Sequence, residues 1–110
     1  YFEKTPPGCI ENHLLTVALM EKETMIGYGH LDKASDGIWL GLAIIESARN
    51  KGFGKMLMDF MLDFARRNIR DIIKLSVDKS NSHAIALYQK YGFKVCYDLN
   101  DRSVLMELKL

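Results

Sequence analysis

IWLGLAIIESARNKGFGKML, residues 38–57, is an apolar run that passes into a basic, glycine-containing turn and then into a helix-forming sequence. The run from 38 to 45 is almost wholly apolar, which is typical of a strand buried on both faces of a sheet. One of its faces carries Gly41 and Ala43, which leave room for another backbone or a narrow ligand. The segment therefore predicts a central strand that leads into a helix.

After the turn, apolar residues recur at helical spacing, with charged residues at the opposite positions. This pattern predicts an amphipathic helix over about residues 52–68, whose apolar face carries Phe53, Leu57, Phe60, Met61 and Phe64. The next apolar run, residues 72–77, predicts a second buried strand. A helix that joins two such strands is typical of a crossover between parallel strands.

The rest of the chain predicts shorter elements on both sides of this unit. Residues 1–13 are expected to be an irregular lead-in, and strands are expected at 14–20 and 25–31, which with 38–45 form an antiparallel meander. A short helix at 84–91 ends at a glycine, and residues 93–110 read as a hairpin. The order βββ-α-β-α-ββ predicts one mixed α/β (α+β) domain over 1–110, with a mostly antiparallel sheet.

Composition limits the classes of function. A chain of 110 residues supports one core, and its net charge of +1 gives no general reason to expect a nucleic acid or an anionic membrane as partner. Cys9 and Cys96 lack the spacing of metal ligands, so we expect reduced thiols, no metal and a cytoplasmic protein. No signal peptide or apolar run of membrane-spanning length is present in the chain.

The basic turn predicts a local anion site. Arg49, Lys51 and Lys55 surround Gly52 and Gly54 at the start of the predicted helix. A helix N-terminus offers unpaired N–H groups and partial positive charge, worth roughly 0.3–1 kcal/mol for a favourable contact. Glycines let a phosphate approach the backbone, although a flexible basic turn is the alternative reading. The spacing matches neither a P-loop nor the dinucleotide fingerprint.

A second motif, SVDKSNSHAIALYQKYGFKV (76–95), follows the R-x-x-G-x-G pattern of residues 49–54. Together the two motifs resemble the GNAT family of acetyl-CoA-dependent N-acetyltransferases, over roughly residues 14–97. The features that carry the resemblance are Ile44, Arg49, Gly52, Gly54, Asn81, Ala84, Leu87, Tyr88, Gly92 and Phe93.

The resemblance implies a site for acetyl-CoA as cosubstrate. Backbone groups of 42–44 would pair with the pantetheine arm, and the N–H groups of 50–55 would wrap the pyrophosphate. Asn81 would bind the cofactor near its pantetheine or phosphate portion, or would only cap a helix. The implied cofactor-binding residues are Leu42, Ala43, Ile44, Arg49, Asn50, Lys51, Gly52, Phe53, Gly54, Lys55, Asn81 and Tyr88.

Tyr88 is the residue that the resemblance assigns to catalysis. In many members of the family, a tyrosine at this position protonates the departing thiolate. A phenol with a pKa of about 10 is a suitable donor to a thiolate whose acid has a pKa of about 8.5. The alternative is that Tyr88 is packed core. The oxyanion would take a hydrogen bond from a backbone N–H near Ile44.

The attacking amine needs a base. If it resembles lysine, with a pKa of about 10.4, only about one molecule in a few thousand is neutral at pH 7. Some family members carry a glutamate where this chain has Ser76, so the base is open here. Glu46 and His30 are the candidates, and for each a structural or solvated role is the alternative.

Two functions follow from this reading. The first is an N-acetyltransferase that moves acetyl from acetyl-CoA to a primary amine, on a small molecule or peptide, by direct attack in a ternary complex. The second is a non-catalytic acyl-CoA-binding regulatory module. Family members usually place a strand and two helices before the meander, and those helices wall the acceptor site. Either such residues lie outside this chain, or another subunit, as in a homodimer, supplies that wall.

Overall fold

A computed structural model describes residues 13–49 and 51–110, and these residues form six strands and two α-helices. The predicted order of elements is confirmed, and most boundaries agree within two residues. His13 belongs to the first strand, so the predicted lead-in ends one residue earlier, and the rest of it lies outside the described residues. The elements are β1 (His13–Glu21), β2 (Thr24–Ala34), β3 (Gly37–Ile44), the short 3-10 helix η2 (Glu46–Ala48), α1 (Phe53–Asn68), β4 (Ile72–Asp78), α2 (Ser82–Lys90), β5 (Lys94–Asp98) and β6 (Ser103–Lys109).

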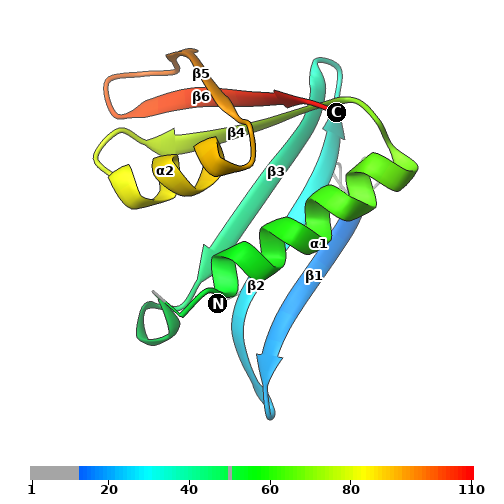
Figure 1. The fold of residues 1–110 in the computed structure, drawn as a ribbon, viewed down its shortest axis with the longest axis vertical. Coiled ribbons are helices and arrows are strands. Elements are labelled where there is room, and N and C mark those ends of the chain that lie inside the picture. The colour runs from blue at the N-terminus through cyan, green and yellow to red at the C-terminus, as the bar shows by residue number, and fades with distance from the viewer. Residues whose placement is uncertain (1–12, 50) are drawn as a thin grey trace.

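The strands form one mixed sheet in the order β1-β2-β3-β4-β6-β5 (Figure 1). The meander β1-β2-β3 and the pairs β4-β6 and β5-β6 are antiparallel, while β3 and β4 are parallel. The predicted parallel crossover through α1 is therefore confirmed. Figure 1 shows both helices in front of the same face of the sheet.

The strands β3 and β4 separate soon after they meet. Their ladder consists of the pairs Ile38–Ile73 and Trp39–Lys74, although β3 continues to Ile44 and stays paired to β2 along its length. Where the two strands are still paired, Asp36 connects them, because it accepts hydrogen bonds from Trp39 Nε1 at 3.3 Å and from Lys74 Nζ at 3.3 Å. The far part of β3 therefore has a strand on only one side.

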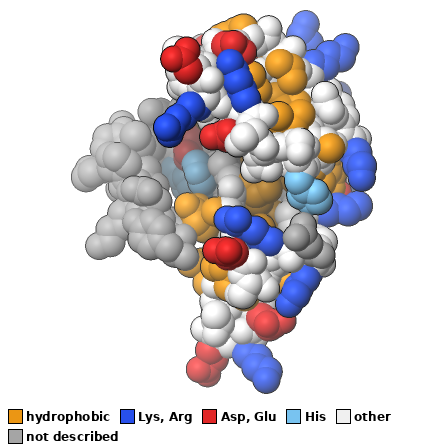
Figure 2. All heavy atoms as spheres, turned by 90° about the vertical axis from the view of Figure 1, so that its left-hand side faces the viewer, with side chains coloured by type: hydrophobic (Ala, Val, Ile, Leu, Met, Phe, Trp, Pro, Cys, Tyr) orange, Lys and Arg blue, Asp and Glu red, His pale blue; other side chains and the backbone are white. Residues whose placement is uncertain are grey.

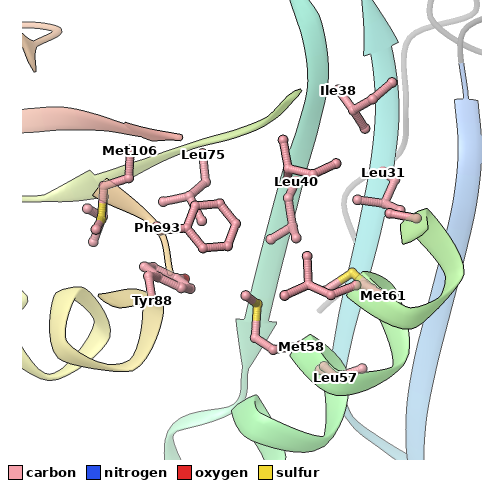
Figure 3. Packing of buried hydrophobic residues seen from close by; sticks show 14 of the residues in the cluster. Leu31, Ile38, Leu40, Leu57, Met58, Met61, Leu75, Tyr88, Phe93 and Met106 are labelled. Carbon is pink, nitrogen blue, oxygen red and sulfur yellow. The ribbon is translucent and has the colours of Figure 1, made fainter. Parts of the chain in front are cut away.

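The core fills the space between the helices and this face of the sheet (Figure 3). The buried positions of α1 are spaced three and four residues apart, which places them on one side of the helix. Figure 3 shows Met58 and Met61 directed toward Leu40 of β3, with Tyr88 and Phe93 near Leu75 of β4. The buried residues of α1 are Leu57, Met58, Met61, Leu62 and Ala65.

The predicted apolar face of α1 is rotated relative to the observed one. Phe60 is 54% exposed, so its expected place in the core was wrong. Phe53 and Phe64 are half-buried at the margin of the helix, whereas Met58 and Leu62 are completely covered. A helix with apolar residues on most of its sides does not reveal from its spacing alone which stripe faces the sheet.

Within the described part of the chain, no helix has the length and apolar character needed to cross a membrane. Among the same residues, no group of side chains is arranged to hold a metal ion. Cys96 is a free, exposed thiol, and Cys9 lies outside the described residues.

Two methionines of α1 provide a test of this packing. Met61 is fully buried and meets Gly29 so closely that a Cβ at Gly29 would lie 2.6 Å from its sulfur, whereas Met56 is 53% exposed. We expect Met61→Ala to lower the free energy of unfolding by about 2–5 kcal/mol. Met56→Ala, the matched control, should change it by less than about 0.5 kcal/mol. Urea denaturation measures both, and equal effects would contradict the orientation of α1.

Candidate active site

A cavity of about 500 Å³ opens where β3 separates from β4, between the N-terminal end of α1 and the helix α2. Figure 2 shows this side of the molecule, where hydrophobic side chains lie inside a hollow and lysine or arginine side chains lie around it. The cavity is lined by Leu42, Ala43, Ile44, Ala48, Arg49, Gly52, Phe53, Gly54, Lys55, Asn81, His83, Ala84, Leu87 and Tyr88. Residues from both motifs of the sequence therefore meet around one space.

The N-terminus of α1 begins at a glycine beside the cavity. Gly52 is its N-cap residue, and the φ of +84° is a left-handed conformation that glycine adopts without strain. Among the described residues no side chain caps this end of the helix, and its first turn contains no acidic residue. The first N–H groups of a helix have no partner within the helix, so those of Phe53, Gly54 and Lys55 remain for a ligand.

The two glycines of the turn serve different purposes. A Cβ at Gly52 would meet nothing within 4 Å, so its backbone conformation is what requires glycine. A Cβ at Gly54 would meet only Leu87 Cδ2, at 3.5 Å, which is an ordinary contact. A larger side chain at Gly54 would enter the cavity rather than the core.

Two cations border the turn. Arg49 reaches back toward the end of β3, where its Nε lies 3.4 Å from the carbonyl oxygen of Ile44. Lys55 is exposed and pairs with Asp59 at 3.2 Å, one helical turn further on. Of the other predicted residues in this turn, Lys51 does not line the cavity, and Asn50 lies outside the described residues.

Next to this turn, one edge of β3 has no neighbouring strand among the described residues. Leu42, Ala43 and Ile44 are paired to β2 on one side, but the ladder to β4 has already ended on the other. Backbone N–H and C=O groups along such an edge are available to an extended ligand, as in the addition of a strand to a sheet. All three residues line the cavity, and their pairing with a cofactor, which the family resemblance implies, stays a prediction.

Asn81 caps α2. Its Oδ1 accepts a hydrogen bond from the N–H of Ala84 at 3.1 Å, so the capping role that the sequence left open is observed. The residue also lines the cavity. Because the cap uses only the side-chain oxygen, the amide nitrogen remains free to donate a hydrogen bond to a ligand.

Tyr88 lies on the cavity side of α2 and is 8% exposed. Its ring packs against that of Phe93, with the centroids 6.0 Å apart. Burial raises the pKa of its phenol above the ordinary value, so the hydroxyl keeps its proton at neutral pH. The ring therefore belongs to the core and the residue also lines the cavity, while its catalytic role stays a prediction.

Tyr91 ties α2 to α1, which sequence reasoning did not foresee. Its hydroxyl donates to the carbonyl oxygen of Lys55 at 3.1 Å and to Asp59 Oδ1 at 2.5 Å. Burial, together with the Asp59 carboxylate, raises the pKa of Tyr91, while the bond from Tyr91 and the nearby Lys55 lower the pKa of Asp59. The first turn of α1 is thus held directly by the helix that carries Tyr88.

The two candidate bases lie outside the cavity lining. Glu46 is exposed in η2, and His30 lies on β2, where its Nδ1 is 2.7 Å from Asp32 Oδ2. The lining also includes Ala48, His83, Ala84 and Leu87, which were not predicted as site residues. For the last two, the helical spacing of 84, 87 and 88 was the available signal.

A strand edge thus opens beside a helix end that has no side-chain cap among the described residues. Comparison with known proteins identifies the class. The model of the Acetyltransferase (GNAT) family matches residues 2–93. The chain belongs to this family.

Individual relatives agree with this assignment. An uncharacterized N-acetyltransferase, YvbK of Bacillus subtilis (strain 168), is 36% identical over 56 residues, which are 51% of this chain and 36% of that relative's length. PaiA N-acetyltransferase from Thermoplasma acidophilum, solved in complex with coenzyme A, superposes with a TM-score of 0.75 at 26% identity, over 87% of this chain and 60% of that one. The Escherichia coli ribosomal-protein-S18-alanine N-acetyltransferase shares the fold, with a TM-score of 0.75 at 24% identity over 90% of this chain and 70% of that one.

Substitution of Asn81 separates its capping role from contact with a ligand. Aspartate caps helices as well as asparagine but has no N–H to donate, so Asn81→Asp should leave the melting temperature nearly unchanged and weaken acetyl-CoA binding. Asn81→Ala removes the cap as well as the amide N–H, so it should lower the stability by about 1 kcal/mol and also weaken acetyl-CoA binding. Thermal melting and calorimetric titration measure the two effects. Unchanged affinity in Asn81→Asp would limit this residue to its cap.

Proposed function

We propose that this protein is an N-acetyltransferase that transfers the acetyl group of acetyl-CoA to a primary amine by direct attack in a ternary complex. The observation that carries the proposal is the opening between β3 and β4, which ends at the uncapped N-terminus of α1. A backbone edge and an anion site lie next to each other there, as an extended arm with a diphosphate at one end requires.

The residues fit coenzyme A as the carrier of the acetyl group. The first-turn N–H groups of α1 and the cations Arg49 and Lys55 would hold the diphosphate. The free edge of β3 from Leu42 to Ile44 would pair with the amide groups of the pantetheine arm. The Asn81 amide would donate a further hydrogen bond. PaiA N-acetyltransferase, solved with coenzyme A, supports this assignment.

The chemistry needs two contributions from the chain after the amine attacks. A backbone N–H near Ile44 would stabilise the oxyanion that forms when the amine nitrogen bonds to the thioester carbon. Tyr88 would then donate its phenolic proton to the departing sulfur as the C–S bond breaks. Burial raises the pKa of this phenol, which keeps it protonated at neutral pH but makes it a weaker acid, so the proton would move to sulfur only as negative charge develops there.

Ligand-dependent melting tests the cofactor site. Acetyl-CoA at about 100 times its Kd should stabilise the wild-type protein by about 2.7 kcal/mol. Gly54→Leu should fold normally but lose this stabilisation, because the added side chain enters the cavity. Ala86→Leu places the same side chain at an exposed position of α2 and is the control. Equal stabilisation of all three proteins would show that the ligand, if bound, lies elsewhere.

Release of free thiol from acetyl-CoA tests the reaction. The acceptors are a peptide with an N-terminal alanine, lysine, spermidine and glucosamine. Tyr88→Phe should lower kcat by about 100-fold or more and change KM little, because the proton is needed only as the thiolate leaves. An unchanged kcat, with chemistry limiting turnover, would remove Tyr88 from this role. A wild-type protein that binds acetyl-CoA but transfers no acetyl group would be the non-catalytic module instead.

A further inference from the structure

The sheet face that α1 does not cover carries a chain of four hydrogen-bonded side chains. Met61 of α1 meets Gly29, so the neighbouring His30 points to the opposite face. There His30 Nδ1 lies 2.7 Å from Asp32 Oδ2, and His13 Nδ1 lies 2.7 Å from Asp32 Oδ1. His13 Nε2 in turn lies 2.5 Å from Thr16 Oγ1.

When both rings are neutral, this arrangement selects one tautomer for each histidine. A carboxylate only accepts hydrogen bonds, so both Nδ1 atoms donate to Asp32, and each neutral imidazole keeps a lone pair on Nε2. The lone pair of His13 accepts the hydroxyl proton of Thr16. The Nε2 of His30 has no hydrogen-bond partner among the residues that the structure describes. Within the described residues, the series of hydrogen bonds therefore ends at one basic nitrogen, His30 Nε2.

That nitrogen lies over Gly41, beside the opening. His30 pairs with Gly41 across β2 and β3, and a Cβ built on Gly41 would lie only 2.1 Å from His30 Nε2. The absence of a side chain at Gly41 is therefore what lets the ring lie across β3. Gly41 comes after Trp39, the last residue of β3 that pairs with β4. The ring of Tyr28 stacks on that of His30, with the centroids 6.3 Å apart, and restricts its movement.

The thioester end of the cofactor would come close to this point. The anion site follows the carboxyl end of β3, so a pantetheine arm that runs along β3 from Ile44 toward Leu42 brings its acyl end toward Gly41. Each residue of a strand spans about 3.3 Å, so Gly41 lies about 3.3 Å beyond Leu42 along β3. A second cavity, of about 240 Å³, shares Ala43 and Ile44 with the first and also includes Tyr28. An amine could approach along the face that carries His30.

The other candidate bases are less suitable. Ser76 stands on β4, and its hydroxyl is too weak a base to deprotonate an ammonium group. Glu46 and His30 both lie outside the lining of the two cavities, but Glu46 is exposed in η2 and its side chain has no hydrogen-bond partner among the described residues. His30, by contrast, has a carboxylate that holds its tautomer, as in other histidine bases.

We propose that His30 is the general base of the transfer and that Asp32 is its positioning residue, an inference that rests on the proposed acetyltransferase activity. His30 Nε2 takes one proton from the ammonium group and passes it to water. The freed lone pair then forms the C–N bond while the carbonyl electrons move to oxygen. As the oxyanion re-forms the carbonyl group and the C–S bond breaks, Tyr88 gives its proton to sulfur, and the second proton that the nitrogen loses restores the Tyr88 phenol.

The test compares pH profiles of variants in thiol release, with whichever amine of the panel the wild-type protein acetylates fastest. His30→Asn should lower kcat/KM at pH 7 by about 100-fold or more, and the deficit should shrink as the pH rises and the acceptor loses its proton in solution. Hydroxylamine, whose nitrogen is already unprotonated at pH 7, should react with the variant nearly as fast as with the wild type, after subtraction of the uncatalysed rate. The affinity for acetyl-CoA should not change.

Three further variants make the assignment specific. Asp32→Asn should show the same pH-dependent loss in smaller degree, whereas Asp63→Asn, which removes an aspartate from an exposed ion pair with Arg67, should not. Gly41→Ala keeps the imidazole but displaces it, so it should reproduce the loss seen in His30→Asn. If His30→Asn does not fold, Gly41→Ala is the variant that tests the proposal.

The outcomes separate this inference from the proposed function. Wild-type turnover that persists in His30→Asn would overturn the base and leave the acetyltransferase intact. A loss that is equal at every pH and with hydroxylamine would show a structural role and would also overturn it. A pH-dependent loss in Glu46→Gln but not in His30→Asn would assign the base to Glu46. A wild-type protein that acetylates none of the probes would overturn both proposals.

Discussion

The separation of two parallel strands after only two register pairs is the feature on which the site depends. Backbone groups inside a protein must be paired, so a central strand that loses its neighbour needs another partner. In β3 this unpaired stretch lies directly before the glycine turn and the uncapped start of α1. Hydrogen-bonding groups of β3 and the positive potential of the helix end are thus left open side by side, and no other part of the described residues closes them.

The sequence was sufficient to predict the architecture because each element carried a strong local signal. The apolar runs at 38–45 and 72–77 identified the two central strands, and the helix between them required a parallel connection. The orientation of α1 was not predicted correctly, since Phe60 continues the helical spacing and yet is exposed. Which of several apolar stripes is buried depends on the shape of the sheet, and a spacing pattern does not contain that shape.

The candidate site could be predicted in the same way, up to a limit. The two motifs located most of the cavity lining because their residues are adjacent in sequence at the ends of elements. The bond from Tyr91 to the first turn of α1 joins residues 36 positions apart, and the chain of His13, Asp32 and His30 depends on the register of two strands. Neither can be read from spacing. The role of Gly41 likewise appears only when the ring that lies across it is in place.

The hydrogen bond from Tyr91 to the carbonyl oxygen of Lys55 connects the two places where the ends of the ligand would lie. Tyr91 is the C-cap residue of α2, the helix that carries Tyr88. Its hydroxyl is hydrogen-bonded to the first turns of α1, where the diphosphate is proposed to bind. A shift of that turn when the nucleotide end docks would therefore be transmitted mechanically to α2. Anchoring the far end of a long, flexible carrier would then also set the alignment of the phenol at its reactive tip.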